Sequence, residues 1–285
     1  MAKGIEIIRT VADLRRLVAQ FRSRRESVAL IPTMGALHEG HLALVRAGQT
    51  QCRRTIATIF VNPLQFGPKE DLQAYPRDEA GDLEQLRRVN TDAVYLPTVE
   101  EMYPPGSSTT VTVTGLTEGL CGKFRPGHFQ GVATVVAKLL LQALPDVALF
   151  GEKDYQQLQV IKRMARDLNI PVTISGVPTV RETDGLALSS RNRYLTPEQR
   201  RSAPLLHQVL DRVAAGYGAG QAPAPLLKTA IADLERGGFG PIQYVEICDA
   251  ETLAPVTASG IRSRVLAAAY LGKTRLIDNV PAVPA

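Results

Sequence analysis

Residues 27–41 read SVALIPTMGALHEGH, and three local signals follow one another within this short stretch. The first seven residues form an apolar run typical of a strand that is buried on both faces of a parallel sheet. A turn through Gly35 comes next, and from His41 onward the apolar residues have helical spacing. A strand, a loop and a helix N-terminus in this order form a phosphate-binding geometry, because the first turn of a helix offers unbonded backbone N–H groups and a partial positive charge.

The same alternation of strand and helix continues on both sides of this stretch. Alternation of this kind is typical of an α/β fold with a Rossmann-like, doubly wound parallel sheet, in which ligands gather at the carboxyl ends of the strands. The predicted strands are residues 27–33, 55–61, 92–96, 147–150 and 172–177, and the predicted helices between them are residues 11–22, 41–54, 80–89, 132–144 and 155–168.

The alternation of short strands and helices ends near residue 178, and we predict two domains, residues 1–178 and 179–285. The sequence TPEQ at 196–199 supplies an N-cap, a first-turn proline and a capping-box glutamine, which predicts one helix that runs to about residue 215. The glycine-rich residues 216–220 then read as a linker. A helix at 225–236 and strands at 242–248, 264–271 and 274–278 predict a smaller α+β domain, and the final VPAVPA is expected to fray.

Composition excludes several classes of protein. The chain has 285 residues, of which 45% are hydrophobic and 21% charged, so disorder, a collagen-like repeat and a disulfide scaffold are poor descriptions. No apolar run approaches the ~18 residues that span a bilayer, and the N-terminus lacks the apolar core of a secretory signal, so we expect a cytoplasmic protein with no membrane partner. A net charge of +5 over this length is too dilute to indicate nucleic acid, and the three cysteines lie too far apart to suggest a disulfide framework or a zinc site.

Two of the four histidines lie in the turn after the first strand. His38 and His41 are three residues apart, so they can share one face of a helix and add hydrogen-bond donors to a phosphate site. Gly40 leaves room for a nucleotide to approach the backbone. Zinc is a poor alternative, because the H-E-x-x-H pattern needs histidines four apart. Other glycine motifs are absent: residues 272–274 (GKT) read as a hairpin turn rather than a P-loop, since position 267 is alanine and a strand follows.

Three more segments follow strands or enter the second domain, and each contributes polar groups. Residues 60–66 (FVNPLQF) carry Asn62 and Gln65, whose amides can bond a hydroxyl and a carboxylate together, although Asn-Pro alone is also a simple turn signal. Residues 150–157 carry Lys153, which suits phosphate, and Asp154, which near a helix start is equally a cap. Residues 180–192 contain Ser-Ser-Arg at 189–191, a mobile phosphate clamp.

Each of these segments is weak evidence alone, but together they predict a specific site. The histidines, the lysine and the Ser-Ser-Arg clamp all suit a triphosphate. The amides of Asn62, Gln65 and Gln157 remain for a polar substrate that is not a phosphate.

The sequence resembles the pantothenate synthetase (pantoate–β-alanine ligase) family. Six segments follow the pattern and the order of that family between about residues 27 and 195: PTMGALHEGHLALV, FVNPLQF, YPRD, KFRPGHFQGVATVV, LFGEKDYQQL and DGLALSSRNRYL. The resemblance implies a nucleotidyltransferase-type Rossmann domain of the H-x-G-H kind, with residues 179–285 as a lid. It also implies a homodimer that uses ATP and Mg²⁺ to ligate (R)-pantoate and β-alanine through a pantoyl-adenylate, in the biosynthesis of pantothenate and coenzyme A.

The same resemblance implies roles for individual residues. His41 is the candidate catalytic histidine with His38 as its partner, and Lys153 and Arg191 complete the catalytic set. Gln65 matches the residue shared by pantoate and β-alanine, Gln157 a second pantoate ligand, and Asp82 an acid on the magnesium side. The implied ATP contacts are Met34, Gly35, Ala36, Leu37, His38, Glu39, Gly40, His41, Gly151, Glu152, Lys153, Asp154, Val180, Leu188, Ser189, Ser190 and Arg191.

Two rival functions are compatible with parts of this pattern. One is another small-molecule adenylyltransferase of the same fold, such as a nicotinamide-nucleotide or aminoacyl-tRNA enzyme. The amides at the strand ends favour a small polar acid instead. The other rival is a non-catalytic module that binds a nucleotide or RNA through the same basic residues.

Overall fold

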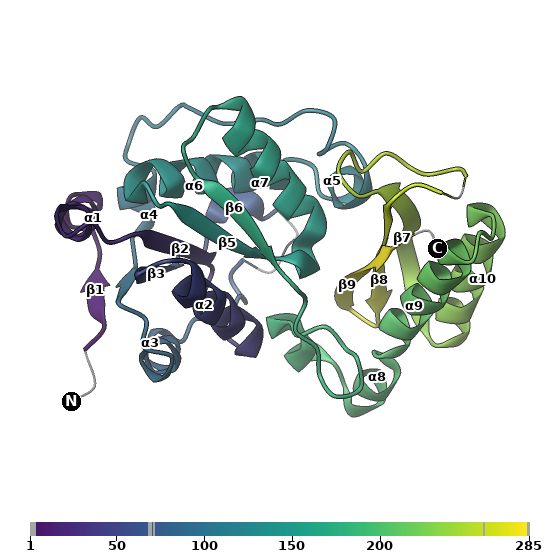
Figure 1. Cartoon of the computed structure of the whole chain (residues 1–285). Helices are drawn as coiled ribbons and strands as arrows, with labels where there is room; N and C mark the ends of the chain where they lie inside the picture. The colour runs from purple at the N-terminus through teal and green to yellow at the C-terminus, as the bar shows by residue number, and fades with distance from the viewer. Residues whose placement is uncertain (1–3, 68–69, 71, 259, 284–285) are drawn as a thin grey trace. The chain divides into compact units, whose positions relative to one another are not determined.

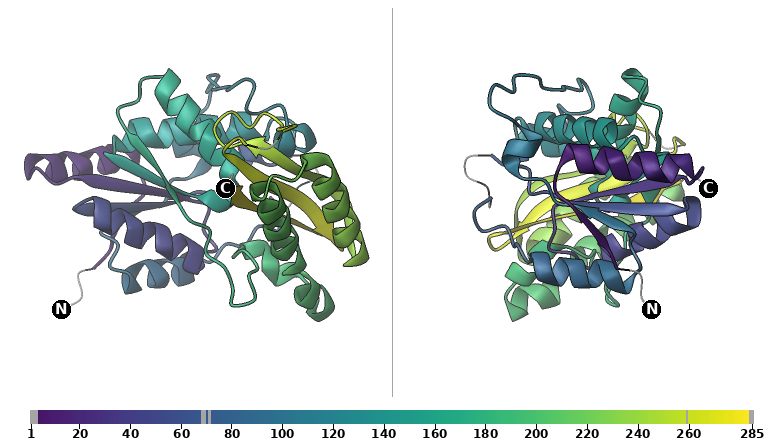
Figure 2. Two further views of the ribbon diagram at one scale, coloured as in Figure 1. Left: turned by 45° about the vertical axis from the view of Figure 1, so that its right-hand side comes forward. Right: turned by 90° about the vertical axis from the view of Figure 1, so that its left-hand side faces the viewer.

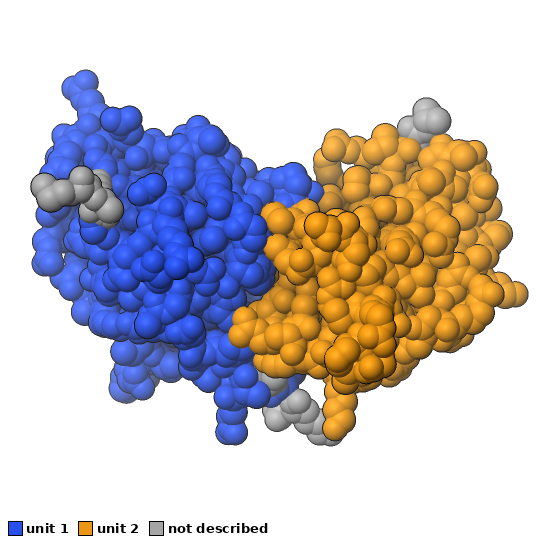
Figure 3. All heavy atoms as spheres, turned by 90° about the horizontal axis from the view of Figure 1, so that it is seen from below, with its two compact units in different colours: residues 1–152, 160–178 blue, residues 153–159, 179–285 orange. Residues whose placement is uncertain are grey.

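A computed structural model describes residues 4–67, 70, 72–258 and 260–283 of the chain. They form two compact units, shown in different colours in Figure 3. The first comprises Met1–Glu152 and Val160–Pro178, and the second comprises Lys153–Gln159 and Thr179–Ala285. Helix α7 (Tyr155–Asp167) therefore begins in the second unit and ends in the first.

The first unit is built on one six-stranded sheet in which every pairing is parallel. Its strand order is β1-β4-β3-β2-β5-β6, which confirms the predicted doubly wound sheet. Strand β1 was not predicted, because it has only three residues and two of them are exposed. The strands are β1 (Glu6–Ile8), β2 (Val28–Thr33), β3 (Arg54–Ile59), β4 (Ala93–Tyr95), β5 (Val147–Gly151) and β6 (Thr173–Val177).

Helices cover both faces of this sheet (Figures 1 and 2). Helices α1 (Val11–Ser23) and α6 (His128–Ala143) lie on one face with α7, and α2 (Glu39–Gln51) and α3 (Glu79–Arg88) lie on the other. Two short helices, α4 (Val99–Met102) and α5 (Leu120–Phe124), belong to the connection between β4 and α6. Among the described residues, no helix combines the length and the apolar character needed to cross a membrane.

The strand order places the carboxyl ends of β2 and β5 side by side. The chain leaves β2 through α2 toward β3, and it leaves β5 through α7 toward β6, in the opposite direction along the sheet. Neighbouring residues of the two strands pair in register, with Ala29 opposite Val147 and Leu30 opposite Ala148. Ligands of doubly wound sheets bind at such a switch point. The loops that follow Thr33 and Gly151 are therefore the expected place for a site.

The second unit contains a three-stranded antiparallel sheet covered on one face by helices α9 (Leu205–Gly218) and α10 (Pro223–Arg236) (Figure 1). Its core is formed by apolar side chains of these two helices and of the sheet. This arrangement confirms the predicted α+β fold. The strands are β7 (Phe239–Asp249), β8 (Ser263–Leu271) and β9 (Thr274–Ala282), and the turn between β8 and β9 is the predicted hairpin at residues 272–274.

Two predictions for this unit were wrong in detail. The single helix expected from residue 196 is two helices, α8 (Pro197–Ser202) and α9, because Pro204 has no N–H to donate to the preceding turn. Helix α9 then continues through the predicted linker to Gly218. Gly216 lets α9 pack closely against α10, because a Cβ at this position would lie only 2.6 Å from Leu226 Cδ2 of α10.

The predicted fraying of the C-terminus was also wrong for residues 280–282. Strand β9 continues to Ala282, which pairs with Ser263 of β8. Pro281 is tolerated because β9 is an edge strand, where a missing N–H leaves no ladder bond unmade. Pro284 and Ala285 lie outside the described residues.

Candidate active site

The loop between β2 and α2 follows a tight path that its residues allow. Gly35 has φ +81° and Ala36 has φ +51°, both in the left-handed region. A Cβ on Gly35 would lie 2.9 Å from Asp82 Oδ2 and 3.0 Å from Ile59 Cγ2, so this position requires glycine for its conformation and for space. The loop delivers the chain to His38, the N-cap of α2, at the switch point of the sheet.

His38 and His41 cap the N-terminus of α2 and lie together, as predicted. The backbone N–H of Gly40 donates to His38 Nδ1 at 3.2 Å, and the N–H of His38 donates to His41 Nδ1 at 3.3 Å. The ring centroids are 4.1 Å apart. Because each Nδ1 accepts a backbone N–H, the proton of each neutral ring belongs on Nε2. The pair therefore brings two Nε2–H donors to a helix N-terminus.

Asp82 lies on α3 and binds the loop itself. Its Oδ2 accepts the N–H of Ala36 at 2.9 Å and its Oδ1 accepts the N–H of Leu37 at 2.7 Å, while Gln85 Nε2 donates to the Leu37 carbonyl at 3.2 Å. The Asp82 side chain is buried. Magnesium needs oxygen ligands that face the ion and its phosphate partners. Both Asp82 oxygens already hold the backbone, which argues against the magnesium role that the resemblance implied.

Among the residues that the structure describes, no group of three or more His, Cys, Asp or Glu side chains could hold a metal ion. Asp82 instead fits a role in holding the loop that carries Ala36 and Leu37.

Replacing Asp82 with asparagine is expected to lower the free energy of unfolding by about 1–3 kcal/mol, because the amide keeps one acceptor oxygen and leaves one buried N–H without a partner. Urea denaturation measures the change. Asp78→Asn is the matched control, since Asp78 accepts the Gly81 N–H at the exposed N-cap of the same helix, where asparagine is an equal cap, and we expect a change below roughly 0.5 kcal/mol. Unchanged stability with a raised magnesium requirement in Asp82→Asn would restore the metal role.

Asn62 precedes the short helix η1 (Pro63–Gln65) and uses its whole hydrogen-bonding capacity within the protein. Its Oδ1 accepts from the Leu64 N–H at 3.2 Å and from the Tyr103 hydroxyl at 2.9 Å. Its Nδ2 donates to Gln65 Oε1 and to the Gly131 carbonyl, both at 3.1 Å. Burial raises the pKa of Tyr103 to about 12, so its hydroxyl remains a donor at neutral pH. Asn62 was predicted to bind substrate, but these contacts favour a supporting role.

The supporting role of Asn62 fixes the direction of the Gln65 amide. Since Asn62 donates to Gln65 Oε1, the Nε2 end of Gln65 is turned the other way, where it lies 2.9 Å from Met34 Sδ. The amide that was predicted to bind pantoate and β-alanine therefore lies directly beside the first residue of the β2–α2 loop.

Two further residues hold the backbone of Gln65, and neither was among the predicted site residues. His128 Nδ1 donates to the Gln65 carbonyl at 2.8 Å, and Arg125 Nη1 donates to His128 Nε2 at 3.0 Å, so the neutral ring carries its proton on Nδ1. Arg125 also forms a two-pronged ion pair with Glu70, with both distances 2.6 Å. Burial works against ionisation of Glu70, but Arg125 outweighs it and lowers the pKa of that carboxyl. The segment KFRPGH at residues 123–128 could have indicated this role, because it places three basic residues from the last turn of α5 to the first residue of α6.

The remaining predicted residues lie at the end of β5, at the start of α7 and in the segment after β6. Gly151 ends β5 and Glu152 begins the short helix η2 (Glu152–Asp154), both in the first unit. Lys153 and the exposed Asp154 follow, and half-buried Gln157 lies in the first turn of α7. The structure thus describes Gln65 and Gln157 in different units.

Residues 180–188 form a small hairpin that was not predicted. Leu188 N–H donates to the Val180 carbonyl at 3.0 Å, and Arg181 and Ala187 form an antiparallel bridge. Directly after it, Ser189 caps the helix η3 (Ser190–Tyr194) by accepting the Arg191 N–H at 3.3 Å. The hairpin therefore brings Val180 and Leu188 together, and Ser189 to Arg191 follow in one turn.

This fold and this site define a class of protein. A doubly wound parallel sheet with an H-x-G-H turn at its switch point, followed by a smaller α+β unit, is the architecture of a nucleotidyltransferase-type enzyme.

Comparison with known proteins identifies the family within this class. The model of the pantoate–β-alanine ligase family matches residues 6–281. The pantothenate synthetase of Paramagnetospirillum magneticum is 56% identical over 100% of both chains. The crystal structure of pantothenate synthetase from Thermus thermophilus has 47% identity and a TM-score of 0.93, and it covers 98% of this chain and 100% of its own. A Francisella tularensis pantoate–β-alanine ligase, solved with β,γ-ATP and β-alanine, has 31% identity, a TM-score of 0.82 and 98% coverage of both chains.

The chain belongs to the pantoate–β-alanine ligase family, and it is a ligase that joins pantoate and β-alanine to form pantothenate. The resemblance inferred from the six sequence segments is thereby confirmed.

Proposed function

We propose that the chain carries out this ligation in two steps, in which its own residues act on ATP and on pantoate side by side. One observation carries the proposal: the Gln65 amide, turned by Asn62, lies 2.9 Å from Met34 in the loop that leads to the His38–His41 pair. The group that is proposed to bind the acid thus lies beside the loop that leads to the proposed phosphate-binding helix N-terminus. A reaction between the carboxylate of an acid and the α-phosphate of ATP requires this proximity.

The chemistry explains why two steps are needed. A carboxylate does not condense with an amine in water, because its oxygen is a poor leaving group. In the first step a pantoate oxygen attacks the α-phosphate of ATP, pyrophosphate leaves, and the acid becomes an acyl-adenylate. In the second step the amine of β-alanine attacks the acyl carbon, the amide bond forms, and AMP leaves with the oxygen. We propose that solvent takes the proton that the amine must lose.

The protein residues supply positioning and an electrostatic field rather than covalent catalysis. As negative charge spreads over the α-phosphate and the departing pyrophosphate, donors that are already in place stabilise it. His38 and His41 offer their Nε2–H groups at the N-terminus of α2, and the proposed nucleotide contacts there are Met34, Gly35, Ala36, Leu37, Glu39 and Gly40. Gln65 and Gln157 are proposed to bind the acid.

We propose, on the family resemblance, that residues of the second unit also bind ATP. Lys153 and Arg191 carry positive charge, and Ser189 and Ser190 add hydroxyl groups, all of which suit the triphosphate. The family resemblance implies further nucleotide contacts at Asp154, Val180 and Leu188 of this unit, and at Gly151 and Glu152 of the first unit. Magnesium is proposed to arrive with the triphosphate as part of the substrate. A homodimer and a cytoplasmic location are proposed on the family resemblance alone.

Pyrophosphate release tests the proposal. With ATP and pantoate but no β-alanine, we expect one burst of pyrophosphate and an enzyme-bound acyl-adenylate, and addition of β-alanine should then give pantothenate and AMP. Pyrophosphate release that depends on a nicotinamide nucleotide or an amino acid instead of pantoate would indicate the rival adenylyltransferase. ATP binding without pyrophosphate release under any of these conditions would indicate the non-catalytic module.

Replacing Gln65 with alanine is expected to weaken the use of pantoate and β-alanine while sparing ATP binding. Its Nε2–H group is proposed to donate to the acid, and leaving polar groups of the substrate unpaired costs about 1–3 kcal/mol each. The KM values for both acids, and the Kd of ATP measured without pantoate, give the result. Gln49→Ala is the control, because Gln49 is an exposed amide on α2 that donates to the Val89 carbonyl. A large loss of ATP affinity with unchanged acid affinities would contradict the separation of the two binding functions.

A further inference from the structure

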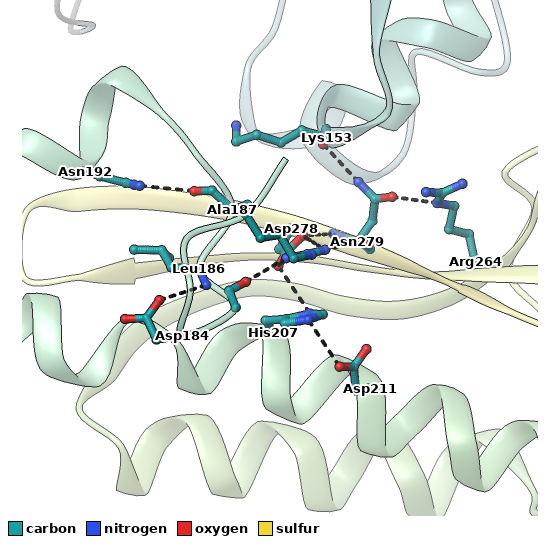
Figure 4. A network of polar contacts seen from close by, with 12 residues as sticks. Lys153, Asp184, Leu186, Ala187, Asn192, His207, Asp211, Arg264, Asp278 and Asn279 are labelled. Carbon is teal, nitrogen blue, oxygen red and sulfur yellow. Dashed lines mark hydrogen bonds and ion pairs between the residues drawn. The ribbon is translucent and has the colours of Figure 1, made fainter. Parts of the chain in front are cut away.

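Strand β9 carries two adjacent polar residues, Asp278 and Asn279, that are both buried. Successive side chains of a strand point to opposite faces of the sheet. Asp278 shares the face of Leu276 and Val280, which belong to the core packed against α9, and Asn279 projects from the other face (Figure 4). Aspartate and asparagine are depleted in strands, and a buried charge is costly unless it is paired. Both side chains therefore need hydrogen-bond or ion-pair partners within the protein.

Asn279 fastens the start of α7 to the sheet. Its Nδ2 donates to the backbone carbonyl of Lys153 at 2.9 Å, and its Oδ1 accepts from Arg264 Nε (Figure 4). The Arg264 guanidinium lies 4.0 Å from the centre of the Tyr155 ring, and the Tyr155 hydroxyl donates to the Ala250 carbonyl at 2.8 Å. Lys153 and Tyr155 are therefore both attached to the rest of the second unit, and Asn279 binds the backbone of Lys153.

Asp278 fastens the hairpin of residues 180–188 to the same strand. Arg181 donates to both carboxylate oxygens of Asp278, at 2.6 and 2.9 Å, and also to the Asn279 carbonyl at 3.3 Å. On the same face, His207 of α9 lies 3.8 Å from Asp278 through its Nδ1. The turn of the hairpin rests on this ring, since a Cβ on Gly185 would lie 2.7 Å from His207 Cδ2.

We propose that Asp278 and Asn279 form a positioning pair for the phosphate-binding residues of the second unit. This inference rests on the proposed role of those residues in binding ATP. Asn279 sets the backbone position of Lys153. Asp278, through Arg181, sets the hairpin that carries Val180 and Leu188 and leads to Ser189, Ser190 and Arg191. Two segments that are separated along the chain are thereby held to one strand at adjacent positions. Neither Asp278 nor Asn279 is a catalytic residue in this proposal.

The proposal predicts an effect on one half of the reaction. Lys153 stabilises charge on the triphosphate, and the pyrophosphate has left before the amine attacks. Loosening Lys153 should therefore slow adenylation and leave amide formation from synthetic pantoyl-adenylate unchanged. A pair that served only to hold the unit together would affect both half-reactions and thermal stability alike.

Asn279→Asp is the sharpest variant, because it keeps the shape and the acceptor for Arg264 but removes the donor to the Lys153 carbonyl. We expect adenylation to fall by about 10- to 100-fold, the loss that a misplacement of about 1 Å produces at a reacting centre. Asn279→Ala should also slow adenylation. Gln243→Ala is the matched control, since Gln243 accepts from Arg275 Nε on β9 at 2.8 Å and has no bond to Lys153; we expect no change in either half-reaction.

A double-variant comparison then tests whether Asn279 acts through Lys153. In the Lys153→Ala background, Asn279→Asp is expected to cause no further loss of adenylation, because the side chain that it positions is gone. Multiplying effects in the double variant, or an equal fall of amide formation in Asn279→Asp, would overturn the proposal. Asp278→Asn tests whether Asp278 positions the hairpin of residues 180–188. We expect a raised KM for ATP and unchanged amide formation. An unchanged KM for ATP would contradict this role.

The outcomes also separate this proposal from the proposed function. If Lys153→Ala slows adenylation but Asn279→Asp and Asn279→Ala do not, the positioning role fails and the function of Lys153 stands. If Lys153→Ala leaves adenylation at its normal rate, the proposed role of Lys153 fails, and the positioning pair fails with it.

Discussion

Replacing His41 with alanine is expected to slow pantoate-dependent pyrophosphate release by about 10²- to 10³-fold in a protein that remains folded. The physical reason is the loss of one donor aimed at the charge that develops on the phosphates, which is worth roughly 2.7–4 kcal/mol in comparable sites. Stopped-flow or quench measurement of pyrophosphate gives the rate, and circular dichroism verifies the fold.

Two further variants separate the roles of the two ring nitrogens of His41. His41→Asn places an acceptor near the position of Nδ1, which holds the His38 N–H, but it has no group at Nε2. His41→Gln places an amide near Nε2 and loses the cap. We therefore expect His41→Gln to retain more adenylation activity and His41→Asn to retain more stability. A folded His41→Asn with near-normal pyrophosphate release would remove His41 from the chemistry.

Replacing Lys153 with alanine is expected to reduce adenylation by about 10²-fold or more while amide formation from synthetic pantoyl-adenylate changes little. A hydrogen bond from a charged donor to phosphate is roughly twice as strong as a neutral one, and its acceptor has departed before the second step. Rapid-quench assays of the two half-reactions, run separately, measure the difference.

Lys162→Ala serves as the control for charge, because Lys162 is exposed on α7 and none of the proposed roles involves it. We expect normal rates in both half-reactions. An equal fall of both half-reactions in Lys153→Ala would indicate a role in the shared acid-binding part of the reaction instead.

The sheet of the first unit was predictable because its signals are local. Apolar runs of four to eight residues mark buried strands whatever their partners are, and the turn through Gly35 to His38 contains its own strand end, glycine and helix cap. The same is true of the capping box at residues 196–199, which is present in the structure. The break at Pro204 was equally local, but the strong cap before it led to the prediction of one continuous helix.

The hydrogen-bond partners of Asn62 and Asp82 were not predictable, because these partners are distant in sequence. Asn62 bonds Tyr103 and Gly131, which are 41 and 69 residues away, and Asp82 bonds Ala36, which is 46 residues away. No local pattern specifies such contacts, so a polar residue at a strand end reads equally well as a ligand or as a support. The hairpin at residues 180–188 was missed for a related reason, since its side-chain anchor on Arg181 lies 97 residues along the chain at Asp278.

The bonds between Asp82 and the β2–α2 loop have a consequence for the thermodynamics of nucleotide binding. Fixing the backbone of one residue costs about 1–2 kcal/mol of conformational entropy, and a loop that orders only when its ligand binds subtracts this cost from affinity. Here the N–H groups of Ala36 and Leu37 are already bound by a buried carboxylate of α3. The entropy of ordering the loop is thus lost when the first unit folds, and the affinity of the proposed nucleotide site is expected to depend on the folding of α3, which carries Asp82.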